Sequence, residues 1–179
     1  MGTTTTLVTV QEFLVLPEPE GQRIELIGGE VVSMGRGGVA HEWVKANLIE
    51  VLRDWARQQS SMKVLSETTY VLDEHNSPIP DVSLLSLSRK PPQMTGWFQG
   101  APDVAIEVVS SEKAAVLETK IELYLAHGSK SVWVVYPERR VVRIFAIDGG
   151  ARLFEREQML EDPLLPGFKA PVSQVFEGI

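Results

Sequence analysis

No cysteine occurs in the sequence, which excludes disulfide bonds, thiolate nucleophiles and zinc sites built on cysteine. The 3 histidines, His41, His75 and His127, lack the close pairing of catalytic zinc motifs. No apolar run approaches the roughly 20 residues of a membrane-spanning helix, and the first residues lack the basic and apolar segments of a secretory signal. We therefore expect a soluble, cytoplasmic protein with no membrane partner.

An excess of positive charge is also lacking, since 17 Lys and Arg residues stand against 24 Asp and Glu residues and the net charge is -7. Non-specific binding to nucleic acid draws most of its strength from Lys and Arg. This balance argues against a protein whose whole surface wraps nucleic acid. A metal-dependent nuclease stays open, because carboxylates around an ion lower the net charge while the bound ion attracts phosphate.

The 179 residues suit one domain, and a chain of this length can bury roughly two thirds of its unfolded surface. No repeat, linker or low-complexity tract divides the sequence. We predict a single α/β domain over residues 1–179.

The N-terminal third alternates short and long elements. Thr9 and Glu12 form a capping-box pattern that predicts a short helix. Two β-like runs around Gly28-Gly29 predict a hairpin over residues 23–34, and a glycine-rich loop, GRGG, follows it. Apolar residues at three- and four-residue spacing then predict an amphipathic helix over residues 41–58.

The remaining segments read mostly as strands. Alternating or apolar runs predict strands over residues 62–72, 79–87, 102–110, 131–136 and 140–147, and an irregular β segment ends at PLLPGF. A helix is predicted from about Lys113 to His127, ending at Gly128. The run 102–110 is apolar on both faces apart from Glu107, as in a central buried strand.

Glu107 is the most informative single residue. Strand alternation places it on one face with Ala105 and Val109, among apolar neighbours. A buried charge survives mainly when it is paired, hydrogen-bonded or bound to a metal. A buried ion pair and a functional carboxylate are both open interpretations.

Two further residues have comparable alternatives. Asp81 follows Pro80 at the start of a predicted strand, where it is either a turn residue or a functional carboxylate. Lys120 lies at the margin of an apolar helical arc that includes Tyr124. Its ammonium either extends to solvent or reaches along the sheet surface.

Four accessory candidates are weaker. His41 near the start of the long helix could face a phosphate, although such a histidine is often only solvated. Glu25 in the hairpin could add a carboxylate, and Arg36 in GRGG could contact a phosphate, although the loop lacks the GK[ST] ending of a nucleotide-binding loop. Glu67 could contribute or could be only a cross-strand partner.

Several segments, in this order, resemble the Uma-two family of the PD-(D/E)xK restriction-endonuclease-like superfamily: RIELIGGEVVSMG, IPDVSLLS, APDVAIEVVSSE, KIELYLAHG and SVWVVYPERRVVRIF. His41 at the start of the long helix belongs to the same resemblance. The likeness covers nearly the whole chain. It implies a restriction-endonuclease-like mixed sheet flanked by helices, with an N-terminal hairpin extension.

The resemblance also implies a site. Asp81, Glu107 and the carbonyl of Val108 would hold Mg²⁺, with Mn²⁺ as a substitute, and Lys120 would assist hydrolysis of a DNA phosphodiester. The family's usual lysine position, two residues after the glutamate, holds Val109 here, so Lys120 would be a migrated lysine.

Two departures from the family pattern keep a second function open. Val116 and Tyr136 stand where aspartates are common in the family. A catalytically weak nucleic-acid- or protein-binding module that retains the nuclease fold is therefore the main alternative, and a hydrolase of another phosphate ester is a third. The resemblance also makes a homodimer plausible.

Overall fold

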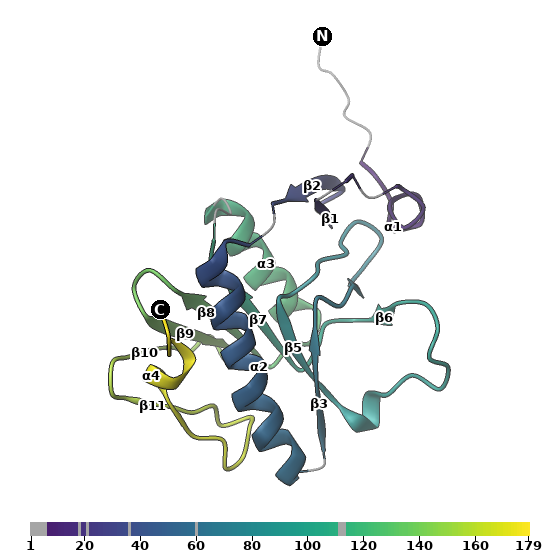
Figure 1. The fold of residues 1–179 in the computed structure, drawn as a ribbon. Helices are drawn as coiled ribbons and strands as arrows, with labels where there is room; N and C mark the ends of the chain where they lie inside the picture. Colours follow the sequence, from purple (N-terminus) through teal and green to yellow (C-terminus); the bar gives the residue numbers. More distant parts are fainter. Residues whose placement is uncertain (1–6, 18, 21, 36, 60, 111–113) are drawn as a thin grey trace.

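The computed structural model describes residues 7–17, 19–20, 22–35, 37–59, 61–110 and 114–179. A six-stranded mixed sheet forms its centre, in the order β10-β9-β8-β7-β5-β3 (Figure 1). The strands are β3 (Met62–Ser66), β5 (Val82–Ser86), β7 (Val104–Val108), β8 (Ser131–Tyr136), β9 (Val141–Ala146) and β10 (Ala151–Glu155). Only β7 and β8 run parallel, and the other neighbours in this sheet are antiparallel.

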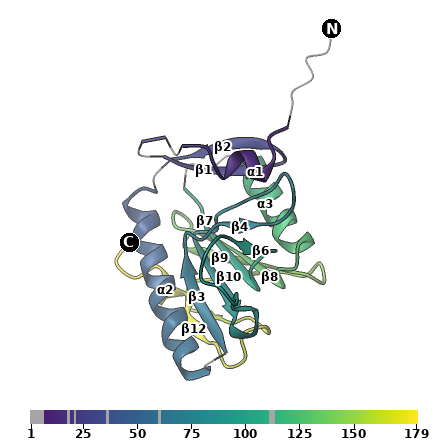
Figure 2. The ribbon, with the colours of Figure 1, turned by 90° about the vertical axis from the view of Figure 1, so that its right-hand side faces the viewer.

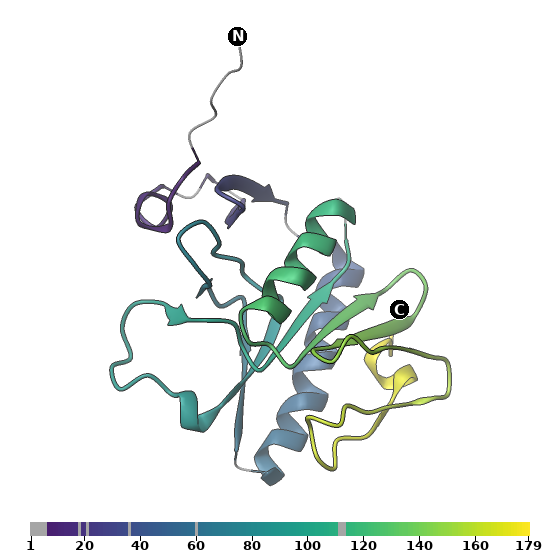
Figure 3. The ribbon, with the colours of Figure 1, turned by 180° about the vertical axis from the view of Figure 1, so that it is seen from behind.

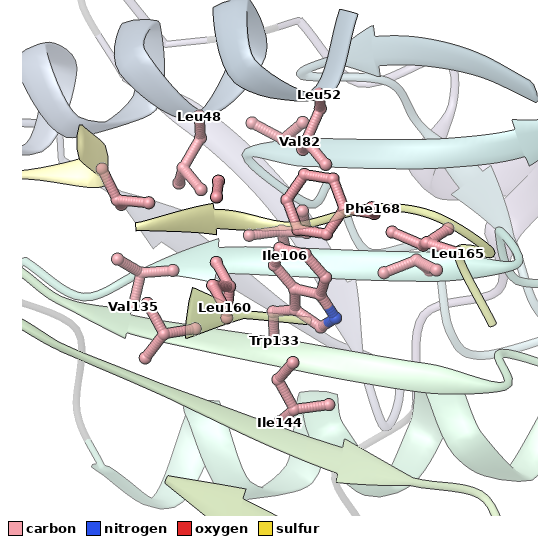
Figure 4. Packing of buried hydrophobic residues seen from close by; sticks show 14 of the residues in the cluster. Leu48, Leu52, Val82, Ile106, Trp133, Val135, Ile144, Leu160, Leu165 and Phe168 are labelled. Carbon is pink, nitrogen blue, oxygen red and sulfur yellow. The ribbon is translucent and has the colours of Figure 1, made fainter. Parts of the chain in front are cut away.

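The two long helices cover opposite faces of this sheet. Figure 1 shows α2 (Val39–Gln59) in front, and Figure 3, seen from behind, shows α3 (Ala114–Ala126) on the other face. The α2 side holds the larger core, in which Leu48 and Leu52 pack with Ile106 and Trp133 (Figure 4). On the α3 side a smaller core forms around Tyr124. The sheet is therefore apolar on both faces, as the apolar run of residues 102–110, which contains β7, predicted.

The N-terminal segment lies across one end of the sheet, near the start of α2 (Figure 2). It comprises α1 (Val10–Phe13) and a hairpin of β1 (Arg23–Ile27) and β2 (Glu30–Met34). The hairpin turns at Gly28 and Gly29, whose φ angles of 59° and 76° lie in the left-handed region that glycine tolerates.

Shorter elements complete the fold. They are β4 (Tyr70–Val71), a 3-10 turn (Leu87–Arg89), β6 (Phe98–Gln99), β11 (Met159–Leu160), β12 (Ala170–Pro171) and α4 (Val172–Val175). The C-terminal elements return to the α2 face, where Val172 and Val175 join the larger core. In the described part of the chain, no helix combines the length and apolar character needed to cross a bilayer.

The predicted element order is confirmed, with several differences in detail. The single strand expected over 62–72 is wrong, because the chain breaks at Glu67, whose φ of 48° is incompatible with a strand. The strand expected from residue 79 begins only at Val82. Neither β12 nor α4 was predicted, because both are short and depend on tertiary contacts: β12 pairs with β11, and α4 packs against α2 and β10.

Candidate active site

Asp81 is brought next to Glu107 by strand register. Val82 of β5 faces Ile106 of antiparallel β7, so Asp81, one residue earlier, lies across from Glu107, one residue later. Oδ2 of Asp81 accepts the backbone N–H of Val108 at 2.8 Å, which holds the carboxylate against the end of β7. Both carboxylates are buried. Pro80 and the strand end thus place an acidic pair at one end of the sheet.

His41 comes from the first turn of α2 and contacts this pair. Its Nε2 lies 3.2 Å from Oδ2 of Asp81, and its Nδ1 lies 3.1 Å from Glu42. Burial by itself lowers the pKa of His41, but the neighbouring carboxylates of Asp81 and Glu42 raise it above its ordinary value. The helix-start histidine is therefore buried and paired, rather than only solvated.

The charge of Asp81 is stabilised in return. Burial by itself raises the pKa of Asp81, but the hydrogen bond and charge of His41, the N–H of Val108 and the charge of Lys120 together lower it below its ordinary value. Asp81 is consequently an ionised carboxylate at neutral pH, in the form that binds a cation.

Glu107 is held by two donors from one face of α3. Lys120 Nζ lies 2.9 Å from its Oε1, and the hydroxyl of Tyr124 donates to the same oxygen at 2.8 Å. Burial, followed by the negative charges of Glu107 and Glu25, raises the pKa of Tyr124 well above its ordinary value. Tyr124 therefore keeps its proton and remains a donor to Glu107.

Lys120 also reaches Glu25 of β1. Its Nζ lies 3.1 Å from both carboxylate oxygens of Glu25, and Glu25 accepts the N–H of Ile79 at 2.7 Å. Lys120 and Glu25 are each only 1% exposed. The alternative of a lysine extending to solvent is thus wrong, and Glu25 is a buried member of the cluster rather than a surface residue of the hairpin.

A second set of charges surrounds Asp81 on the α2 side. Arg23 of β1 lies 3.5 Å from Asp81 and 3.4 Å from Glu67, and Lys45 Nζ lies 2.7 Å from both Glu42 and Glu67. The break in the strand at Glu67 also lets its N–H donate to the carbonyl of Asp81 at 3.2 Å. Glu67 is therefore part of an ion-pair network, rather than only a cross-strand partner.

The remaining candidates take different positions. Val108 is the last residue of β7 and lies between Asp81 and Glu107 in the site. Val116 is half-buried in the first turns of α3, and Tyr136 ends β8. Arg36 lies outside the described residues, as does Lys113 at the expected start of the second helix.

The donor set suits a hard cation. Two buried carboxylates and a backbone carbonyl offer only oxygen ligands, which Mg²⁺ prefers, and Mg²⁺ usually retains several waters beside one or two carboxylates. Within the described ranges, no group of three or more His, Cys, Asp or Glu side chains is arranged to hold one ion. Any ion here would therefore depend on the carboxylates of Asp81 and Glu107, the backbone carbonyl of Val108 and water.

Three features of the site were not predicted from the sequence: the ion pairs of Lys45, those of Arg23, and the hydrogen bond that Tyr124 donates to Glu107. A usable signal existed for two of them, because Lys45 lies four residues after His41 and Tyr124 lies four residues after Lys120, so each pair shares a helix face. Arg23 had no such signal, because only tertiary packing brings β1 to Asp81.

Comparisons with known proteins identify the family and the fold of this chain. The sequence matches the Uma2 family, described as "Putative restriction endonuclease", over residues 10–173. Among curated proteins, none matches. A crystal structure of "a putative nuclease belonging to DUF820" from Anabaena variabilis ATCC 29413 superposes with a TM-score of 0.85 at 23% identity, covering 94% of this chain and 97% of that chain. The fold is therefore restriction-endonuclease-like, and the chain belongs to the Uma2 family.

Proposed function

We propose that this protein is a metal-dependent endonuclease that hydrolyses DNA phosphodiester bonds, with Asp81, Glu107 and Lys120 as its active-site residues. The observation that carries the proposal is the convergence of these three buried charged side chains, which come from separate parts of the chain, at one end of the central sheet. Buried charges are unfavourable unless paired or functional, and such clusters are typical of active sites.

Asp81, Glu107 and the carbonyl of Val108 would hold Mg²⁺ or Mn²⁺. Such an ion would supply Lewis acidity toward a phosphate and toward attacking water. Lys120 would offset the negative charge that develops on the phosphate during attack. His41 keeps Asp81 ionised and oriented, and Tyr124 fixes the position of Glu107.

A binding module without efficient catalysis is the second candidate. The observation that favours it is the pairing of Lys120 with both Glu25 and Glu107, because a buried ion pair of this kind can also be purely structural. Val116 and Tyr136, at positions where the family commonly has aspartates, point in the same direction.

Cleavage of supercoiled, linear and single-stranded DNA with Mg²⁺, Mn²⁺ or EDTA separates the two candidates. We expect metal-dependent cleavage by the wild type and a loss of at least about 100-fold in Asp81→Asn, Glu107→Gln and Lys120→Met. The matched control is Glu122→Gln, which removes an exposed carboxylate of α3 and should retain activity.

Binding of Mn²⁺ provides a readout independent of turnover. An ion that binds only the folded protein raises its thermal stability, by about 2.7 kcal/mol at 100 times the dissociation constant. The increase should disappear in Asp81→Asn. If no DNA is cut and Mn²⁺ leaves the melting temperature of the wild type unchanged, the nuclease proposal is wrong and the binding module takes its place.

A further inference from the structure

A cleft on the α3 side of the sheet lies outside the charged cluster described above. It has a volume of about 610 Å³ and lies over β8, β9 and β10; its lining residues are Tyr136, Arg139, Val141, Arg143, Ala151, Arg152, Leu153 and Glu155. Arg152 pairs with Ile144 of the α2-side core, so its side chain projects from the other face of the sheet. Arg139 and Arg143 therefore face the single carboxylate of Glu155, and the cleft is modestly positive in a chain whose net charge is -7.

The cleft begins at the same end of the sheet as the candidate active site. β7 and β8 are parallel with Val108 opposite Val135, so Tyr136 follows directly beside the end of β7. Figure 3 shows these strands and α3 on the near side. Because Val134, between Arg143 and Glu107 on this face, is buried under α3, a ligand in the cleft would reach Glu107 around the strand ends rather than across the face of the sheet.

Strand register gives the lateral distance. Glu107 pairs with Val134, and Val134 pairs with Arg143, so all three side chains project from the α3 face. Neighbouring strands lie about 4.8 Å apart, which places the Cα of Arg143 about 10 Å from that of Glu107. This distance corresponds to about three nucleotides of a DNA strand, which rises about 3.4 Å per nucleotide.

Arg139 and Arg143 have guanidinium groups available for a ligand. Both are exposed, and within the described part of the chain neither forms an ion pair with a carboxylate. Arg143 lies over the ring of Phe145 at 4.9 Å, which orients its guanidinium plane. By contrast, Arg152 donates to the carbonyl of Glu161. Available, oriented arginines are the groups that best match phosphate geometry.

We propose that this cleft binds the sugar–phosphate backbone of DNA through Arg139 and Arg143, and so positions the strand beside the carboxylates. The inference rests on the proposed nuclease function for its choice of ligand. Charge complementarity favours a polyanion, and the location of Arg139 and Tyr136 at the same end of the sheet as the candidate site favours DNA over an acidic polypeptide.

Binding of a fluorescein-labelled 20-base-pair duplex in EDTA, measured over a series of salt concentrations, tests the proposal without any cleavage. The double variant Arg139→Gln/Arg143→Gln should bind about tenfold more weakly and reduce the salt slope by about 1.8, since each lost phosphate contact contributes about 0.9. Arg143→Lys, which keeps the charge, should retain most of the slope.

Arg53→Gln is the matched control, because Arg53 is exposed on α2 and lies on the opposite side of the sheet. An equal effect of this control, an unchanged slope in the double variant, or no duplex binding by the wild type would overturn the cleft proposal. Displacement of the duplex by polyglutamate as readily as by unlabelled DNA would do the same and would assign an acidic polypeptide instead.

The two proposals can fail separately. If the wild type cuts DNA in a Glu107-dependent manner but the double variant binds like the wild type, only the cleft assignment is wrong. If the double variant loses binding but the wild type cuts no DNA and gains no thermal stability from Mn²⁺, the cleft stands and the nuclease proposal is wrong.

Discussion

At the scale of single residues, charge compensation in the interior is the main feature of this protein. Lys120 lies between the carboxylates of Glu25 and Glu107, and all three side chains are almost completely buried. Removing one partner of a buried ion pair leaves an uncompensated charge away from water, which costs more than the pair itself contributes. Stability and the proposed chemistry therefore depend on the same lysine.

Substitution of this lysine gives the first prediction. Lys120→Met should lower the free energy of unfolding by about 3–5 kcal/mol, because two buried carboxylates lose their cation. Urea unfolding at neutral pH measures the change. Adding Glu25→Gln to this variant should recover part of the loss, because one of the uncompensated charges is then absent. A loss below about 1 kcal/mol in Lys120→Met would show that the pairing adds little.

The contact between His41 and Asp81 gives a prediction for pH. The pKa of His41 is raised in the folded protein and that of Asp81 is lowered, so the charged pair forms only when His41 is protonated. Its contribution to stability is complete below pH 6.5 and is lost as the pH rises through the folded pKa of His41. Unfolding in urea at pH 5.5 and 8.5 should show a larger loss for His41→Gln at pH 5.5.

A double-mutant cycle checks the cause of this pH dependence. In an Asp81→Asn background, His41 keeps Glu42 as a partner but loses the Asp81 carboxylate, and the difference between the two pH values should shrink. Equal losses for His41→Gln at both pH values in the wild-type background would mean that His41 is not held by a charge on Asp81.

At the scale of elements, the glycine-rich loop before α2 positions the histidine. A Cβ on Gly37 would lie 2.1 Å from Nδ1 of His41, so only glycine lets the loop pass this close to the imidazole. Gly35 in the same loop has open space around its Cβ position. The close approach, rather than the general glycine content of the loop, therefore determines where the helix begins relative to Asp81.

This difference gives a matched pair of variants. Gly37→Ala should displace the ring of His41 and lower the free energy of unfolding at pH 5.5 by about 1–3 kcal/mol, as overpacking does. Gly35→Ala should change it by less than about 0.5 kcal/mol. Similar values for both variants, obtained from urea unfolding, would contradict the proposed role of Gly37.

At the scale of the whole molecule, the helices, the N-terminal hairpin and the C-terminal segment are joined to one sheet. The C-terminal segment is tied to α2, since Trp43 Nε1 donates to the carbonyl of Glu177 and Asn47 donates to that of Val175. The N-terminal hairpin is tied to α3 through Glu25 and Lys120. Because the two cores lie on opposite faces of the same strands, neither can be lost without exposing the other.

We expect residues 1–179 to form a single domain, and such a domain should unfold cooperatively. Far-UV circular dichroism, which follows the helices, and tryptophan fluorescence, which follows buried Trp55 and Trp133, should give coincident thermal transitions. Two separate midpoints would instead show that the N-terminal hairpin or the C-terminal segment unfolds independently of the sheet.

The sequence by itself determined the order of the main elements, and it singled out Asp81, Glu107 and Lys120, which the structure brings together. Periodicity identifies a strand or a helix from its own residues, so the buried strand around Glu107 and the amphipathic helix around Lys120 were visible locally. A carboxylate inside an apolar strand is unusual in any context, which is why Glu107 drew attention before its partners were known.

Only the tertiary structure decided which charges meet. Glu25 and Glu67 have the sequence surroundings of surface residues. The role of Glu25 depends on its burial where β1 meets α3, and that of Glu67 depends on the left-handed break that it makes after β3. The closeness of Gly37 to His41 and the location of Arg139 and Arg143 in one cleft likewise depend on how distant segments pack. Local patterns report the conformation of a segment, whereas burial and ion pairing are properties of contacts between segments.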